Sequence, residues 1–397
     1  MRSGPLSGVR VVELAGIGPG PFAAMMLADM GAEVVRVDRA DAVRTPRPTE
    51  RPTDPVLRSR RSVALDLKHE DGLAALLALV ACADALVEGF RPGVMERLGA
   101  GPAECLARNP RLVYGRMTGW GQQGPLAARA GHDIDYIAVA GALAHFGREG
   151  APPTPPLNMV GDFGGGGMLL AFGVACALVE AARSGAGQVV DAAMVDGSAS
   201  LMAMFWGMSH AGHFDEDRRG TNLLDTGAPF YDVYACKGGG WMAVGALEPR
   251  FFAELLAVTG LAEDPAFVAD DGAGGRCSLQ GSRTHWPAQR ARLAEVFATR
   301  TREEWTRATE GRDACVAPVL AMREAAAHPH LAARGTFVSV GGVTQPSPAP
   351  RYSRTVPAAP GAPAHAGEHT REVLADWTGV DAARIDAWLA SGGARQG

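Results

Sequence analysis

Cysteine is scarce in this 397-residue chain, and its spacing excludes the sites that usually depend on it. The chain contains six cysteines, and no two of them are closer than 23 positions. Because there is no C-x-x-C pair, the sequence indicates neither a zinc ribbon nor a redox dithiol, and we expect no metal site. Thiols as scattered as these suit a reducing compartment such as the cytoplasm.

The chain also lacks a large charge of either sign and a long apolar run. Its 38 Lys and Arg against 43 Asp and Glu leave a net charge of −5, which disfavours a general nucleic-acid binder. The N-terminus has no signal-like apolar run. The longest uncharged stretches, 164–179 and 197–214, are glycine-rich or contain Ser and His, whereas a membrane span needs about 20 apolar residues. We therefore expect two buried helices, no nucleic-acid or membrane partner, and a cytoplasmic protein.

Glycine and proline are abundant instead, and the opening of the chain predicts a βαβ unit. The 51 glycines and 27 prolines are roughly a fifth of the residues, below the roughly 25–30% that indicates disorder. Residues 9–14 are β-branched and bounded by glycines, as in a buried strand; a loop, a helix over 22–30 and a strand over 33–37 follow. Further strands are expected at 62–67, 85–87 and 112–116. The predicted fold class is α/β with a parallel sheet.

The pattern changes near residue 200 and predicts a second, smaller domain. A long apolar helix is expected near 200, strands recur over 231–245, and Thr301 with Glu304 fits a capping box at a helix start. We assign the large domain to 1–200, a linker helix region to 201–222, the small domain to 223–321, and a return segment with C-terminal helices packing on the large domain to 322–397.

The residues alone make Asp162 a better catalytic candidate than most aspartates. An aspartate before a helix is usually an N-cap, but the glycines over 164–167 that follow it are costly inside a helix. Bare amides at Gly164, Gly165 and Gly166 would let a ligand oxygen approach closely and would stabilise developing negative charge.

Glycines and arginines near the predicted strand ends indicate other ligand sites less specifically. The Gly16, Gly18 and Gly20 loop does not match G-x-G-x-x-G, and its prolines remove amides that would bind a pyrophosphate, so a dinucleotide site is disfavoured. Arg39 follows the second strand, where open α/β sheets bind ligands. A basic group consists of Arg58, Arg60, Arg61, Lys68, Arg91 and Arg97. Such a group suits phosphates but is also typical of a solvated face.

Several blocks of the sequence resemble the family III CoA-transferase superfamily and, within it, the α-methylacyl-CoA racemases. These blocks are 4–21, 31–39, 87–94, 116–121, 130–136, 160–165, 187–198, 244–249 and 367–370. The resemblance implies a Rossmann-like large domain that binds CoA, a smaller α+β domain, and an interlocked homodimer with each active site between the large domain of one subunit and the small domain of the other. A longer, proline-rich stretch over 40–55 departs from the family pattern and is expected to reshape the rim near the CoA phosphates.

The resemblance also implies which residues form the site. Catalytic roles map onto His132, Asp162 and Glu248, with Glu248 orienting His132. CoA contacts map onto Arg39, Leu67, Lys68, Arg91, Arg97, Asp133 and Tyr136. No cofactor beyond the CoA moiety of the substrate is implied.

Because the block Gly131-His132-Asp133 is present, the resemblance implies an isomerase of lipid metabolism rather than a transferase. It would interconvert (2R)- and (2S)-2-methylacyl-CoA thioesters through an enolate, with His132 and Asp162 each serving one face. The alternative is a CoA-transferase that moves CoA between carboxylic acids through an aspartyl intermediate at Asp162. Burial raises the pKa of a carboxyl group and lowers that of an imidazole. The pKa values of an imidazole and a carboxyl group that share one proton are therefore closer together in a dry site. We expect such a site here.

Overall fold

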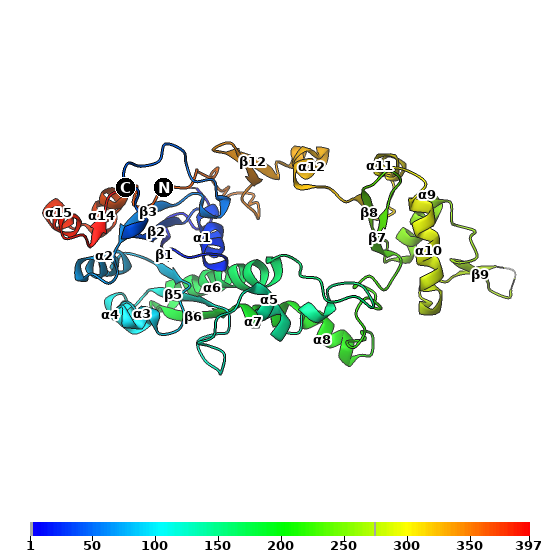
Figure 1. Cartoon of the computed structure of the whole chain (residues 1–397), viewed down its shortest axis with the longest axis horizontal. Helices are drawn as coiled ribbons and strands as arrows, with labels where there is room; N and C mark the ends of the chain where they lie inside the picture. Colours follow the sequence, from blue (N-terminus) through cyan, green and yellow to red (C-terminus); the bar gives the residue numbers. More distant parts are fainter. Residues whose placement is uncertain (1–2, 274) are drawn as a thin grey trace. The chain divides into compact units, whose positions relative to one another are not determined.

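The structure is a computed structural model that describes residues 3–273 and 275–397. The chain divides into two compact units, and Figure 1 labels many of their elements. The first unit comprises Met1–Ala142, Pro156–Met202 and Pro329–Gly397, and the second comprises Leu143–Pro155 and Ala203–His328. The segment 143–155, which the sequence analysis assigned to the large domain, thus belongs to the second unit.

A seven-stranded sheet with the order β14-β3-β2-β1-β4-β5-β6 forms the centre of the first unit. Its strands are β1 (Arg10–Leu14), β2 (Glu33–Arg39), β3 (Arg61–Leu65), β4 (Ala85–Glu88), β5 (Val113–Thr118), β6 (Gln188–Ala193) and β14 (Ala394–Arg395). Strands β1 to β6 run parallel, and β14 pairs antiparallel with β3. The predicted parallel sheet is confirmed. Because the strand order reverses between β1 and β4, the loops after these two strands diverge and leave a crevice at the carboxyl edge of the sheet.

Helices cover both faces of this sheet, which explains why strands β1 to β5 are almost continuously buried. Along β1, Val12 faces a core shared with α2, α14 and α15, and Val11 faces a core shared with α1 and α6. The helices of the unit are α1 (Pro19–Asp29), α2 (Glu70–Ala81), α3 (Val94–Arg97), α4 (Pro102–Arg108), α5 (Asp133–Val139), the π-helical segment η4 (Met159–Met168), α6 (Leu169–Ser184), α7 (Met194–Leu201), α13 (Pro329–Arg334), α14 (Thr370–Thr378) and α15 (Ala382–Ala390). A hairpin of β12 (Phe337–Val340) and β13 (Val343–Pro346) completes it.

Buried ion pairs join α1 and β1 to the segment that precedes β3. Arg58 donates to Asp29 at 3.0 Å, and the Arg60 guanidinium lies 2.7 Å from Glu13, with all four side chains at most 4% exposed. Neither arginine belongs to a solvated face or a phosphate site, the two roles that the sequence suggested for them. Their partners lie far away in sequence, so the pairing is visible only in the fold.

The prediction of a long apolar helix near residue 200 is wrong. The residues form β6 and then two short helices, α7 and α8 (Ala203–His210), separated at Met202. Helix α8 buries none of its residues, so the expectation of a buried helix over 197–214 fails there. By length and composition Met159–Ser184 is apolar enough to cross a membrane, a test that core helices also pass, and its α6 portion packs against β5 and β6.

The second unit is a small antiparallel sheet covered by helices. Its strands are β7 (Tyr231–Ala235), β8 (Trp241–Gly245) and β11 (Val316–Pro318), in the order β11-β8-β7, together with a separate hairpin of β9 (Val268–Asp270) and β10 (Arg276–Ser278). Its helices are α8, α9 (Pro249–Thr259), α10 (Trp286–Phe297), α11 (Arg302–Thr309) and α12 (Met322–Ala327). The capping box at Thr301 is confirmed at the start of α11. An aromatic-rich core that includes Phe252, Phe297 and Trp305 holds this unit together.

Candidate active site

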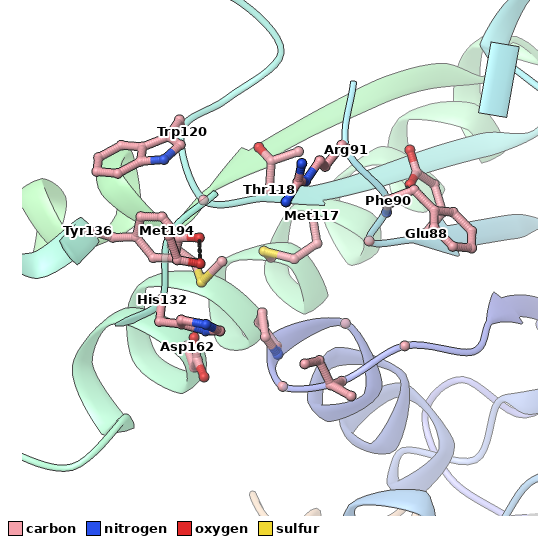
Figure 2. A pocket seen from close by; sticks show the side chains of 18 of the residues that line it. Glu88, Phe90, Arg91, Met117, Thr118, Trp120, His132, Tyr136, Asp162 and Met194 are labelled. Carbon is pink, nitrogen blue, oxygen red and sulfur yellow. Dashed lines mark hydrogen bonds between the residues drawn. The ribbon is translucent and has the colours of Figure 1, made fainter. Parts of the chain in front are cut away.

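A pocket of about 650 Å³ lies at the carboxyl edge of the parallel sheet, where the strand order reverses. We call it the sheet-edge pocket (Figure 2). Its walls come from the loops that follow β1, β4 and β5 and from the segments that begin α5 and η4, with residues 14–21, 87–92, 117–120 and 129–132 among those that line it. Ligands bind at such a position in open α/β sheets.

His132 and Asp162, two of the three expected catalytic residues, both line this pocket, and Figure 2 shows them at the same end of it. His132 directly precedes α5; it is exposed, and its backbone N–H donates to Asp135 Oδ2 at 2.9 Å. Asp162 lies in η4, and its Oδ2 accepts a hydrogen bond from Asn158 Nδ2 at 3.0 Å. One imidazole and one carboxylate therefore reach the same cavity.

The glycine loop after β1 allows the start of α1 to lie close to Asp162. Gly18 has a φ of 68°, in the left-handed region that favours glycine, and a Cβ there would lie 3.3 Å from Asp162 Oδ2. The loop lines the pocket with Gly16, Ile17 and Gly20. Its glycines thus bring a helix start close to a carboxylate.

The loop after β4 carries Arg91 into the pocket and is ordered by a buried carboxylate. Glu88 is 1% exposed; its Oε2 accepts the N–H of Phe90 at 2.7 Å, and its Oε1 accepts from Arg116 Nε at 3.0 Å. Burial raises the pKa of Glu88, while these donors act in the opposite direction. Arg91 and Arg129 both line the pocket, and neither makes an ion pair within residues 3–273 and 275–397.

Arg129 and Asn158 are pocket residues that sequence reasoning missed. Arg129 lies three positions before His132, so nearness to a motif histidine was a usable signal. Asn158 lies four positions before Asp162, one turn of a regular helix. This spacing could not be recognised from the sequence, because the glycines and prolines around Asn158 do not predict that a helical segment begins at residue 159.

Tyr136, one of the expected CoA contacts, also lines the pocket, but its hydroxyl is already used. It donates to the carbonyl oxygen of Gly131, and its ring packs edge-on against Trp120 with ring centroids 4.8 Å apart. Burial raises the pKa of Tyr136. The side chain therefore shapes the loop that presents His132.

Other expected CoA contacts lie on the same edge of the sheet but outside the pocket. Arg39 ends β2, where it is exposed and paired with Asp41, and Leu67 and Lys68 follow the end of β3. Arg97 ends the short helix α3. Asp133 is buried, and its carboxylate accepts the backbone N–H of Asp162. None of these five lines the sheet-edge pocket.

Close helix packing accounts for the run of glycines after Asp162. A Cβ on Gly165 would lie 2.7 Å from the backbone nitrogen of Ser198 in α7, and one on Gly166 would lie 2.9 Å from Pro19 Cβ in α1. Gly164, Gly165 and Gly166 do not line the pocket. The geometry thus gives no support to the oxyanion role expected of their amides.

Glu248 belongs to the second unit, where it precedes Pro249 at the start of α9. Its side chain is exposed and makes no capping hydrogen bond with this helix. A capping role for its side chain therefore does not explain why a glutamate occupies this position. Across the described parts of the chain, no group of three His, Cys, Asp or Glu side chains is arranged to hold a metal ion.

Comparisons with known proteins agree with the fold and with the resemblance. The family model described as "CoA-transferase family III" matches residues 6–370. The α-methylacyl-CoA racemase of Mus musculus is 45% identical and that of Homo sapiens 43% identical, each over 94% of this chain and 93% of the relative. The crystal structure of a CAIB/BAIF family protein from Brucella suis has a TM-score of 0.77 at 24% identity, over 95% of this chain and 100% of that one. The chain belongs to CoA-transferase family III.

Proposed function

We propose that this protein interconverts (2R)- and (2S)-2-methylacyl-CoA thioesters. One observation carries the proposal: an imidazole and a carboxylate, His132 and Asp162, line one pocket at the ligand-binding edge of the sheet. The 43–45% identity to two racemases supports an isomerase.

The chemistry requires one base on each side of the α-carbon. One base removes the α-proton, which is acidic because the carbanion delocalises into the thioester carbonyl as an enolate. The other base donates a proton to the opposite face, so the product carries the inverted configuration and each base has exchanged its protonation state. Repeating the reaction in the reverse direction restores the enzyme.

The unpaired arginines support binding of a CoA thioester. Arg91 and Arg129 line the same pocket as the two bases, and guanidinium groups bind phosphate oxygens well. We assign them to the phosphates of the CoA moiety. Four other residues lie along the same edge of the sheet: Arg39, Leu67, Lys68 and Arg97. We propose that they contact the remainder of the CoA moiety.

We also propose that the active form is an interlocked homodimer in which Glu248 of one chain orients His132 of the other. His132 is exposed in the single chain, so the dry site that the two-base scheme favours needs a cover. Large apolar side chains that also need a cover are Phe172, Leu201, Met204 and Trp206, each 54–67% exposed. We propose no cofactor beyond CoA, and a cytoplasmic location that suits six unpaired cysteines.

CoA transfer through Asp162 is the second candidate, because the family description names this activity and Asp162 lines the pocket. In that reaction the carboxylate attacks the thioester carbonyl, a mixed anhydride forms and CoA leaves as the thiolate. The thiolate then attacks the Asp162 carbonyl of the anhydride, which releases the donor acid and leaves CoA as a thioester on Asp162. A free carboxylate acceptor takes the CoA by the reverse of these steps, which regenerates Asp162.

Proton NMR in D₂O separates the two activities. With 2-methylacyl-CoA and no acceptor acid, the racemase loses the α-proton signal as deuterium enters from solvent, and a pure enantiomer becomes a mixture. A transferase leaves the α-proton in place throughout. It forms a new thioester only after a carboxylic acid is added. That second result would contradict the proposal.

A further inference from the structure

Asp133 follows one candidate base, His132, in the sequence and contacts the backbone of the other, Asp162. It is the first residue of α5, directly after His132, and is 7% exposed. Its Oδ2 accepts the N–H of Asp162 at 2.7 Å, and the N–H of Gly161 donates to the same carboxylate. This side chain therefore joins the start of α5 to the first turn of η4.

The segment η4 approaches the carboxylate of Asp133 closely at Gly161. A Cβ on Gly161 would lie 2.5 Å from Asp133 Oδ2 and 3.2 Å from its Cα, so the two segments touch closely. The side chain does not line the sheet-edge pocket. Burial raises the pKa of Asp133, opposed by the two backbone donors. Its polar atoms thus serve the backbone of η4 rather than a ligand.

We propose that Asp133 is a positioning residue that sets the separation of His132 and Asp162. The inference rests on the proposed racemase function, because only a two-base reaction requires the imidazole and the carboxylate to hold fixed places on opposite faces of one carbon. Misplacing a reacting group by about 1 Å can cost roughly 100-fold in rate.

The fate of the enolate reports this positioning directly. After His132 removes the α-proton, the imidazolium exchanges it with D₂O, and the enolate then either takes a deuteron from His132 with retention or one from Asp162 with inversion. Displacing Asp162 slows only the second path. The variant should therefore exchange deuterium into one enantiomer with retention more often than it inverts it, and the two enantiomers should respond unequally.

Three substitutions and one matched control test the proposal. Asp133→Asn keeps an acceptor oxygen, Asp133→Ala removes it, and Gly161→Ala displaces the carboxylate without removing it. The control is Asp84→Asn, which is matched in the kind of hydrogen bond: Asp84 is exposed but also accepts a backbone N–H, that of Arg10 at 2.8 Å, at the opposite edge of the sheet.

The measurements are kcat, KM and the ratio of exchange to inversion for each pure enantiomer in D₂O. We expect kcat for inversion to fall about tenfold in Asp133→Asn and roughly 100-fold in Asp133→Ala and Gly161→Ala, with KM unchanged within about twofold. The exchange-to-inversion ratio should rise in the same order, while Asp84→Asn matches the wild type. If the Asp133 variants do not fold, Gly161→Ala supplies the test.

Two results would overturn the positioning role alone. A rise in KM at unchanged kcat would make Asp133 a CoA contact, as the resemblance implies. A lower melting temperature at an unchanged exchange-to-inversion ratio would make it a structural residue only. Absence of α-exchange in the wild type would instead contradict the proposed function, and this inference with it.

Discussion

Charged side chains in the first unit fall into two regions that differ in how they are paired. At the amino-terminal strands and α1, Glu13, Asp29, Arg58 and Arg60 are almost fully buried, and each has a partner of opposite charge. At the sheet-edge pocket, Arg91 and His132 are exposed and make no ion pair with any residue that the structure describes. Buried charges require partners for stability, whereas a ligand site must leave some groups unpaired. Pairing thus separates the buried structural arginines, Arg58 and Arg60, from Arg91, to which we assign CoA binding.

Removing a base from the pocket should give the largest effect and leave stability unchanged. We expect Asp162→Asn to lower racemisation by roughly 10³–10⁴-fold, because a positioned acid or base contributes about 10²–10⁴-fold and the carboxamide cannot replace it. The free energy of unfolding should change by no more than about 0.5 kcal/mol. The affinity for CoA, measured by calorimetry, should equal that of the wild type. An equal loss of CoA affinity would show that Asp162 is structural.

Breaking a buried pair should give the opposite pattern. Arg60→Met at pH 8 leaves the Glu13 carboxylate buried without its partner, and we expect a loss of about 3–5 kcal/mol in urea unfolding. Arg61→Met is the control, because the partners of Arg61, Glu33, Glu372 and Asp376, are 39–58% exposed. A loss of stability no larger than that of the control would remove the distinction between the two regions.

The pH dependence of stability sharpens the description of the buried region. Burial raises the pKa of Glu13 to about 7, and the attraction of Arg60 offsets only part of this. A carboxyl group whose pKa is raised on folding stabilises the native state most below its ordinary pKa, and this contribution is lost as the pH rises through about 7. The stability of the wild type relative to Glu13→Gln should therefore fall between pH 4.5 and 8. A relative stability that rises over this range would contradict it.

Each pocket arginine should affect binding more than turnover. We expect Arg129→Ala and Arg91→Ala to raise KM for the acyl-CoA about tenfold, equivalent to ~1.4 kcal/mol, with kcat largely kept. An acyl-pantetheine thioester, which lacks the CoA diphosphate, is the control and should show no difference between variant and wild type. Equal effects on both substrates would place these arginines away from the phosphates.

The smallest effect is expected at Asp41. The pair of Arg39 with Asp41 is 82% and 66% exposed, and solvent screens such a pair strongly. Asp41→Ala should leave the unfolding midpoint unchanged and release Arg39 for CoA, lowering KM slightly. A clear loss of stability would show that pairing on the surface matters here as it does in the interior.

Most of the parallel sheet was predictable from sequence, because local patterns determine local elements. The strands that became β1 to β5 are short β-branched or apolar runs bounded by turns, and the turns contain the residues that favour them. Strand β6 was not predicted: Gln188 and Asp191 interrupt its apolar pattern, and its hydrogen bonds to β5 come from far along the chain. Long-range pairing therefore overrides weak local preference.

The candidate site was predictable only in part, for the same reason. His132 and Asp162 belong to motifs, whereas Arg129 and Asn158 join the pocket through the folding of loops. Arg58 and Arg60 look like Arg91 in sequence, and only partners 29 and 47 positions away assign them to the interior. The glycines after Asp162 indicated a ligand, but the helices that pack against them explain their presence.

The fate of the α-hydrogen in a single enantiomer tests the central claim most directly. Pure (2R)-2-methylacyl-CoA is incubated with the wild type in D₂O, and the products are separated by chirality and analysed by mass. Two bases that serve opposite faces predict that the newly formed (2S) thioester carries one deuterium at the α-carbon and that both enantiomers approach equal amounts. An α-hydrogen that stays protium while the configuration remains (2R) would contradict the account.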